Sequence, residues 1–174
     1  MVDSISVTFR ISNKKIEALK SVAEEKRISL NVLVNNILDS YLEWEYHAPK
    51  VGFVPMQKSV LKDLFDAIPD ETIMQIATKA ADKFRDELMM IYGKVDLESM
   101  ISFTKNRITR SGFVLREFEG SGEEGERRMV IKHDVGPKWA LFSKIYIERL
   151  INNVGQAAKV ETVDNTLVVE ILAC

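Results

Sequence analysis

The start of the chain alternates strictly between apolar and polar residues. Apolar residues occupy the odd positions from Ile5 to Ile11, and polar residues occupy the even positions from Ser4 to Ser12. Successive side chains of a β-strand point to opposite faces, so a period of two predicts a strand over residues 4–12. One face of this strand would be apolar and the other polar.

Two helical patterns follow the predicted strand. Residues 13–27 carry an apolar stripe, and Ser12 stands where a serine would cap the first turn. A second amphipathic pattern begins at Leu30, after a further candidate cap at Ser29, and ends near Glu45. The short segment between the two patterns leaves room only for a tight turn.

Two prolines and a glycine interrupt the helical pattern between residues 47 and 55. Proline disfavours helix both at its own position and at the preceding residue, so residues 48–55 are predicted to be a linker. This linker would separate a module of residues 1–47 from a larger domain of residues 56–174.

The larger domain changes from helical to strand patterns halfway along. Its periodicity predicts three helices followed by a β-β-α-β-β arrangement, and the fold class is therefore α+β. The helices are expected at 57–68, 70–92, 96–110 and 137–153, and the strands at 113–119, 127–133, 159–163 and 166–172. The first two strands flank a glycine-rich acidic loop at 120–125. The methionines of the long helices, Met89 and Met90 among them, are expected in helix contacts.

Composition narrows the class of protein. The formal net charge is -2, and Cys174 is the only cysteine, so neither an internal disulfide nor a multi-cysteine metal site can form. No apolar run approaches the roughly 20 residues that cross a bilayer, and the N-terminus has no secretory pattern. We expect a cytoplasmic protein that does not associate with membranes.

The sequence offers little catalytic chemistry. His133 and Asp134 are adjacent, but the only other histidine is His47, and a metal site needs three or four ligands. The alternative is structural, with Asp134 at a strand end or helix cap and Trp139 packed inside. Phosphate-binding glycine loops and nucleophile motifs are absent from the sequence. We therefore expect no enzyme activity, no cofactor and no metal.

The N-terminal module is too small to bury a core alone. Its amphipathic strand needs a partner, and antiparallel pairing with the same strand of a second copy would supply one through two-fold symmetry. The polar face of the resulting two-stranded ribbon would carry two copies of Ser6, Thr8 and Arg10. A two-stranded ribbon fits the major groove of B-DNA, where arginine, serine and threonine can bond base edges.

Within the N-terminal module, residues 4–45 resemble the ribbon-helix-helix superfamily of repressors. The resemblance lies in the strand 5–12, the helix 13–26 and the segment 27–42, about a quarter of the chain. It implies that the three polar strand residues face the bases. It also implies that backbone amides near the start of the second helix hold a DNA phosphate, at Ser29, Leu30 and Asn31. Lys14 and Lys15, at the start of the first helix, are expected near the DNA backbone.

The sequence thus predicts a homodimeric, sequence-specific transcription regulator, a repressor, that binds double-stranded DNA. The C-terminal domain would bind a small-molecule effector or join dimers into tetramers. Residues 1–47 hold six Lys and Arg against seven Asp and Glu, so we expect modest non-specific affinity. Three alternatives remain: a dimeric adaptor, a ligand sensor that does not bind DNA, and an antitoxin-like autoregulator, against which the folded-looking C-terminal domain argues.

Overall fold

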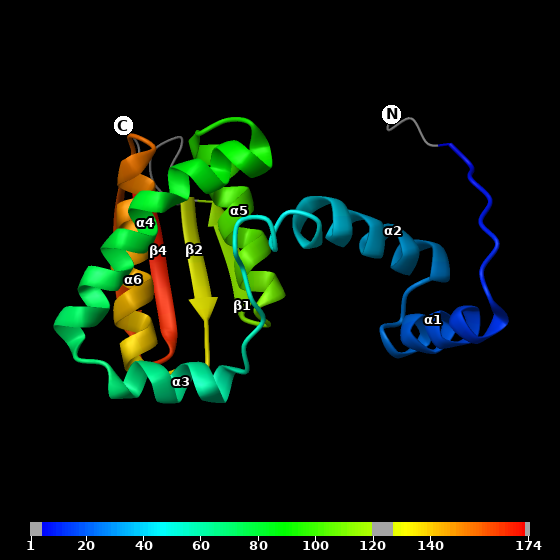
Figure 1. Cartoon of the computed structure of the whole chain (residues 1–174), viewed down its shortest axis with the longest axis horizontal. Helices are drawn as coiled ribbons and strands as arrows, with labels where there is room; N and C mark the ends of the chain where they lie inside the picture. The colour runs from blue at the N-terminus through cyan, green and yellow to red at the C-terminus, as the bar shows by residue number, and fades with distance from the viewer. Residues whose placement is uncertain (1–4, 120–126, 173–174) are drawn as a thin grey trace. The chain divides into compact units, whose positions relative to one another are not determined.

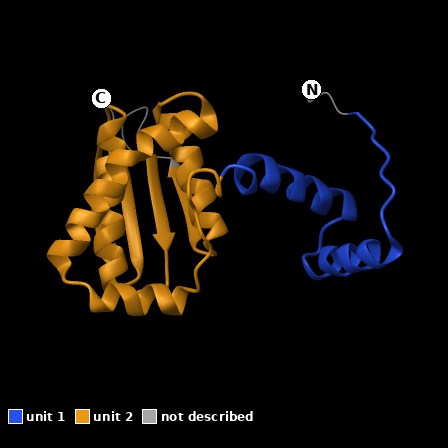
Figure 2. Cartoon of the chain, viewed as in Figure 1, with its two compact units in different colours: residues 1–47 blue, residues 48–174 orange. Residues whose placement is uncertain are grey.

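The computed structural model describes residues 5–119 and 127–172 (Figure 1). The chain divides into two compact units, Met1–His47 and Ala48–Cys174 (Figure 2). Each unit is described by itself. The predicted acidic loop at 120–125 and the single cysteine, Cys174, lie outside the described residues.

Unit 1 is a helical hairpin preceded by an irregular segment. Helix α1 (Asn13–Glu25) and helix α2 (Leu30–Ser40) are joined by a turn in which Arg27 adopts φ 55°. The amide of Ile28 donates to the carbonyl of Ala23 at 3.0 Å, and the amide of Arg27 donates to that of Glu24 at 3.0 Å. These two bonds form a Schellman turn, in which a left-handed residue ends the first helix.

The predicted N-terminal strand does not form in the single chain. Residues 5–12 have no regular secondary structure, and among the described residues the first strand begins at Val114. The backbone amides and carbonyls of a strand are satisfied by a neighbouring strand. The alternating pattern alone cannot provide that neighbour, and none of residues 5–47 forms a strand.

The second helix of unit 1 changes its hydrogen-bond pattern near its end. The α-helical part stops at Ser40 and a π-helix, η1 (Tyr41–Glu45), continues it. The amide of Tyr46 donates to the carbonyl of Tyr41 at 2.9 Å, five residues earlier. Helical structure therefore reaches Glu45 as expected, and its last turn is a π-helix.

Unit 2 confirms the predicted α+β order of three helices followed by β-β-α-β-β. Its helices are α3 (Lys58–Ala67), α4 (Asp70–Tyr92), α5 (Leu97–Arg110) and α6 (Pro137–Asn153). Its strands are β1 (Val114–Glu119), β2 (Arg127–Lys132), β3 (Ala157–Val163) and β4 (Thr166–Leu172). They form one antiparallel sheet in the order β1-β2-β4-β3.

The core of unit 2 lies between one face of the sheet and its helices (Figure 1). Helix α6 packs on β3 and β4, α4 packs on α6, and α5 lies beside β1. The strand residues that face these helices are buried: Met129, Ile131, Val160, Leu167, Val169 and Ile171. The core therefore covers one side of the sheet.

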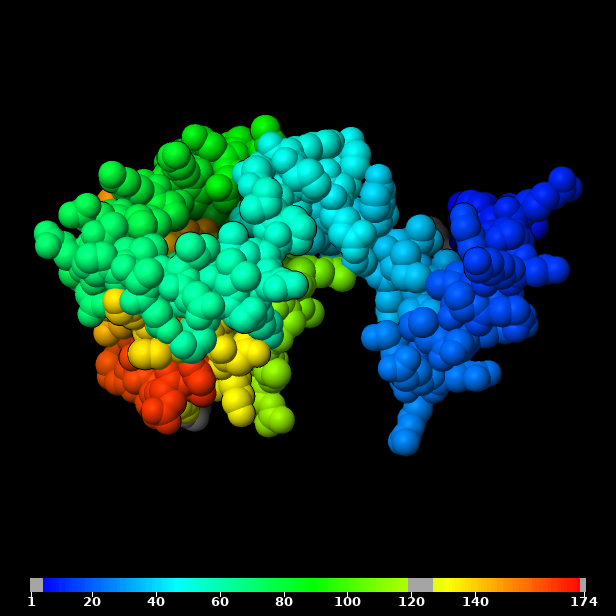
Figure 3. Space-filling model, turned by 60° about the horizontal axis from the view of Figure 1, so that its bottom comes forward, coloured from blue at the N-terminus to red at the C-terminus, as the bar shows by residue number. Residues whose placement is uncertain are grey.

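The segment before α3 also belongs to the packing of unit 2. Ala48 is buried, and the ring of Phe53 lies 5.8 Å from that of Phe103 in α5. From α3, the ring of Phe65 contacts Trp139 edge-on at 5.1 Å. Residues from about 50 to 70, cyan to blue-green in Figure 3, cover much of the face of unit 2 that is turned to the viewer.

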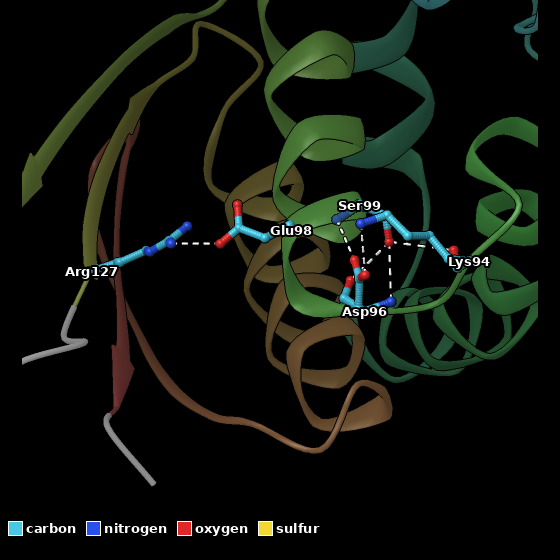
Figure 4. Close-up of polar contacts among 5 residues, drawn as sticks. All are labelled: Lys94, Asp96, Glu98, Ser99 and Arg127. Atoms are coloured by element: carbon cyan, nitrogen blue, oxygen red, sulfur yellow. Dashed lines mark hydrogen bonds and ion pairs between the residues drawn. The ribbon is translucent and has the colours of Figure 1, made fainter.

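Helix α5 begins with a capping box (Figure 4). The amide of Ser99 donates to Oδ1 of Asp96 at 2.8 Å, and the amide of Asp96 donates to Oγ of Ser99 at 3.1 Å. Nζ of Lys94 lies 2.8 Å from the same carboxylate. The bond from Lys94, followed by those from Ser99, lowers the pKa of Asp96 from 3.8 to about 2.

This cap gives the protein a specific acid sensitivity. The pKa of Asp96 is lower in the folded chain, so its stabilisation is complete above pH 3.8 and is lost as pH falls through about 2. Asp96→Asn keeps a good N-cap but does not titrate. We expect denaturant titrations between pH 5 and pH 2 to show a shallower loss of unfolding free energy in Asp96→Asn than in the wild type. Equal slopes would contradict this expectation.

Candidate nucleic-acid interface

The three candidate base-reading residues lie on the irregular segment that precedes α1. Ser6, Thr8 and Arg10 are all exposed, and the apolar side chains between them are exposed too. Ile5 is 86% exposed and Phe9 is 66% exposed. Both faces of the segment are therefore open in the single chain, and the polar residues alternate along it as the sequence indicates.

The start of α2 has the geometry of an anion site. The side chain of Ser29 accepts a hydrogen bond from the amide of Val32 at 3.2 Å. The amides of Leu30 and Asn31 lie in the first helical turn, where no carbonyl of the helix can accept them. The positive end of the helix dipole adds to these free donors, so the site suits a phosphate oxygen.

The start of α1 presents two basic side chains. Ser12 occupies the N-cap position, but its side chain makes no capping bond, and its carbonyl accepts from Lys15 at 3.0 Å and Ile16 at 3.1 Å. The side chains of Lys14 and Lys15 are exposed on the first turn. They are free to meet an external anion without breaking an ion pair among the described residues.

The charges of unit 1 are unevenly distributed. Residues 5–16 contain Arg10, Lys14 and Lys15 and no acidic residue. Asp3 precedes this stretch, and the next carboxylate along the chain is Glu17, which pairs with Lys20 at 3.0 Å. The remaining carboxylates follow from residue 24 onward. The total charge of the module is therefore close to balanced, although residues 5–16 carry only basic charges.

Unit 1 exposes more large apolar side chains than it buries. Its buried apolar residues are Ala23, Leu33 and Trp44. Eleven large apolar or aromatic residues are exposed: Ile5, Val7, Phe9, Ile11, Val22, Val32, Ile37, Leu38, Tyr41, Leu42 and Tyr46. An exposed apolar surface of this kind marks an interaction site.

Unit 2 contains a polar cluster that sequence spacing does not show. The guanidinium of Arg107 lies 4.7 Å from the ring of Tyr146 and 5.6 Å from that of Phe53. Burial raises the pKa of Tyr146, and the charge of Arg107 opposes the rise. Burial likewise raises the pKa of Glu87, again opposed by Arg107. These four residues come from four separate segments, so only folding brings them together.

The adjacent pair His133 and Asp134 does not form a charged dyad. His133 is 3% exposed, and its Nδ1 accepts from the amide of Val135 at 3.4 Å. Burial lowers its pKa, and Asp134 opposes this effect. Asp134 is exposed and pairs with Lys58 at 3.0 Å, while Trp139 stacks on Phe142 at 5.2 Å. Asp134 therefore follows the end of β2, as the structural alternative expects, but the N-cap of α6 is Gly136, and Trp139 is half-buried.

No family model, no curated protein and no solved structure matches the chain. Within residues 5–119 and 127–172, no group of three or more histidine, cysteine, aspartate or glutamate side chains is placed to hold a metal ion. Among the same residues, no helix combines the length and the apolar character needed to cross a membrane.

Proposed function

We propose that this protein is a homodimeric, sequence-specific DNA-binding repressor of transcription whose unit 1 is a ribbon-helix-helix module. The observation that carries the proposal is the segment of residues 5–11. It alternates apolar and polar side chains, and it exposes both sets in the single chain. A segment of this pattern is suited to pair with another strand and to bury one face.

A second copy of the same segment is the partner that fits best. Antiparallel pairing about a two-fold axis would let alternate residues of each segment exchange backbone hydrogen bonds with the other copy. The four apolar side chains of each segment would then pack on the helices, which offer exposed apolar residues including Val22, Val32 and Ile37. Dimerisation thus accounts for a unit in which, among residues 5–47, only three apolar residues are buried in the single chain.

The opposite face of the ribbon would read DNA. It would carry Ser6, Thr8 and Arg10 from each chain, and these are the hydrogen-bonding residues of the segment between Ile5 and Ile11. Arginine can donate two bonds to guanine in the major groove, and serine and threonine can bond either base edge. The free amides at Leu30 and Asn31 would hold a phosphate and fix the orientation of the ribbon.

Arg10→Ala tests the base-reading role. Loss of a bidentate arginine contact costs about 1–3 kcal/mol, and the dimer presents two copies, so specific binding should weaken at least about tenfold. The operator is first selected from a random duplex library, and affinity is then measured by fluorescence anisotropy at fixed salt. Lys26→Ala, an exposed change at the far end of α1, is the matched control. Equal loss in both variants would contradict base reading by Arg10.

The near-balanced charge of unit 1 favours one alternative, an adaptor in which this module only dimerises. Under that alternative, the selection would enrich no sequence, and Arg10→Ala would change neither DNA affinity nor dimerisation. Under the proposal, it enriches a two-fold symmetric site, and Arg10→Ala leaves the dimer intact. The same two measurements therefore separate the two functions.

A further inference from the structure

The sheet of unit 2 has a second face that no helix of this unit covers. Helices α5 and α6 lie on the face that carries Met129 and Val169. Figure 4 shows Arg127, on that same face of β2, reaching toward Glu98 of α5. The opposite face, which we term the outer face, presents large exposed apolar side chains: Val114 at 55%, Phe118 at 50% and Val163 at 63%.

The strand register arranges the outer face in rows of four residues. Directly opposite residues of antiparallel strands share a face, so each row can be followed from β1 to β3. The central row is Arg116, Val130, Val168 and Glu161. It therefore runs from a cation at one sheet edge, through two valines, to an anion at the other.

The two flanking rows are ordered in a related way. The first contains Phe118, Arg128, Glu170 and Lys159, and the other contains Val114, Lys132, Thr166 and Val163. In either row, the first residue can be paired with the last and the second with the third, as they would meet if the row of a second copy lay over it in reverse order. Each such pair is compatible in charge or polarity. Arginine meets glutamate, lysine meets phenylalanine, valine meets valine and lysine meets threonine.

We propose that this outer face binds the outer face of a second copy about a two-fold axis parallel to the strands. Such an axis lays β1 of one copy over β3 of the other. It also places each row over the same row of the second copy. Arg116 makes no ion pair within the described residues and would face the partner copy's Glu161, which pairs with Lys159 of its own chain at 2.6 Å and would then lie between two cations. The same operation places Val130 over the partner copy's Val168. Stacked sheets pack about 10 Å apart in a similar face-to-face manner.

The charges on this face favour a second copy over a single-stranded nucleic acid. Phe118 and the cations of β1 and β2 would suit stacked bases and phosphates. Glu161 and Glu170 share the same rows, however, and would repel a phosphate backbone. For a second copy these two carboxylates are instead the complements of the cations. The contact would link two chains independently of unit 1.

Thiol crosslinking in a Cys174→Ser background tests the geometry. With strands about 4.8 Å apart and sheets about 10 Å apart, the two copies of residue 130 lie about 11 Å apart, and those of residue 114 about 17 Å. A short bis-maleimide should therefore give covalent dimers of Val130→Cys and at least about fivefold fewer of Val114→Cys. An equal mixture of Val114→Cys and Val163→Cys chains, left to exchange subunits, should give covalent dimers, because residue 114 of one copy lies over residue 163 of the other. Absence of Val130→Cys dimers, or equal yields at 130 and 114, would overturn the proposal.

Charge reversal in the Val130→Cys chain provides the second arm. Arg116→Glu places like charges together and should lower the yield roughly tenfold. Arg116→Glu with Glu161→Arg should restore it, and Lys79→Glu on the exposed side of α4 should leave it unchanged. A double variant no better than Arg116→Glu overturns the proposal. The proposal is also overturned if Arg116→Glu leaves the crosslinking yield unchanged but loses binding of a labelled oligothymidylate, a result that would indicate a nucleic-acid surface. Neither arm alters unit 1, so failure here leaves the proposed DNA-binding dimer intact.

Discussion

Replacing Phe9 with aspartate is expected to abolish the dimer formed by unit 1. In the proposed ribbon, Phe9 lies on the apolar face, and the single chain leaves it 66% exposed. Burying an unpaired carboxylate there would cost about 3 kcal/mol or more, which corresponds to at least about a hundredfold loss of dimer affinity. Specific DNA binding should disappear with it, because base reading requires both strands of the ribbon.

Hydrogen exchange of residues 5–12 is the measurement that isolates this dimer from other contacts. In the wild type, the alternate amides that donate to the partner strand should be protected, and in Phe9→Asp they should exchange as in an unstructured peptide. Thr8→Asp is the matched control, because it adds the same charge one residue away on the polar face. Protection should survive in Thr8→Asp. Loss in both variants, or an unprotected wild type, would contradict the ribbon.

Phe84→Ala is expected to be the most destabilising single change in unit 2. Phe84 is 1% exposed, and its ring meets that of Phe103 edge-on at 4.8 Å. Truncation of a buried phenylalanine removes apolar contacts and leaves a cavity, at a cost of about 3–5 kcal/mol. Urea unfolding followed by circular dichroism would show the loss as a lower midpoint with an unchanged slope.

Met89→Ala on the same helix is the control for this change. Met89 is 53% exposed and Met90 is 61% exposed, so the expectation that these methionines lie in helix contacts of the chain is wrong. They follow the buried Leu88, on the side of α4 turned away from the core. The variant should change the unfolding free energy by about 0.5 kcal/mol or less. If Met89→Ala lowered the unfolding free energy as much as Phe84→Ala, the exposed side of α4 would have to be covered in the folded protein.

Local signals in the sequence were sufficient for most elements of unit 2. Gly93 ends α4 with φ 68°, Asp96 caps α5, and Pro137 begins α6, each at the position that its chemistry favours. The turn between β3 and β4 falls at Asp164, where φ is 50°. These features depend on neighbouring residues alone, so a linear reading can find them.

The features that sequence reasoning missed depend on distant residues. The contact of Arg107 with Phe53 and Tyr146 joins three segments, and no spacing rule relates them. The Schellman turn at Arg27 was expected only as a tight turn, because its left-handed residue is an arginine rather than the usual glycine. The π-helix at Tyr41–Glu45 also gave no periodic signal, since its apolar pattern suits an α-helix equally well.

The sequence by itself determined the α+β order of unit 2 and the two-faced pattern of residues 5–11. Both follow from local periodicity, which the hydrophobic effect imposes on any strand or helix with one buried side. Only the tertiary structure decided which sheet face the helices cover and which side chains share a row on the other. It also showed that residues 5–12 form no strand in one chain. The backbone hydrogen bonds of a strand require a neighbouring strand, and the part of this unit that the structure describes contains none.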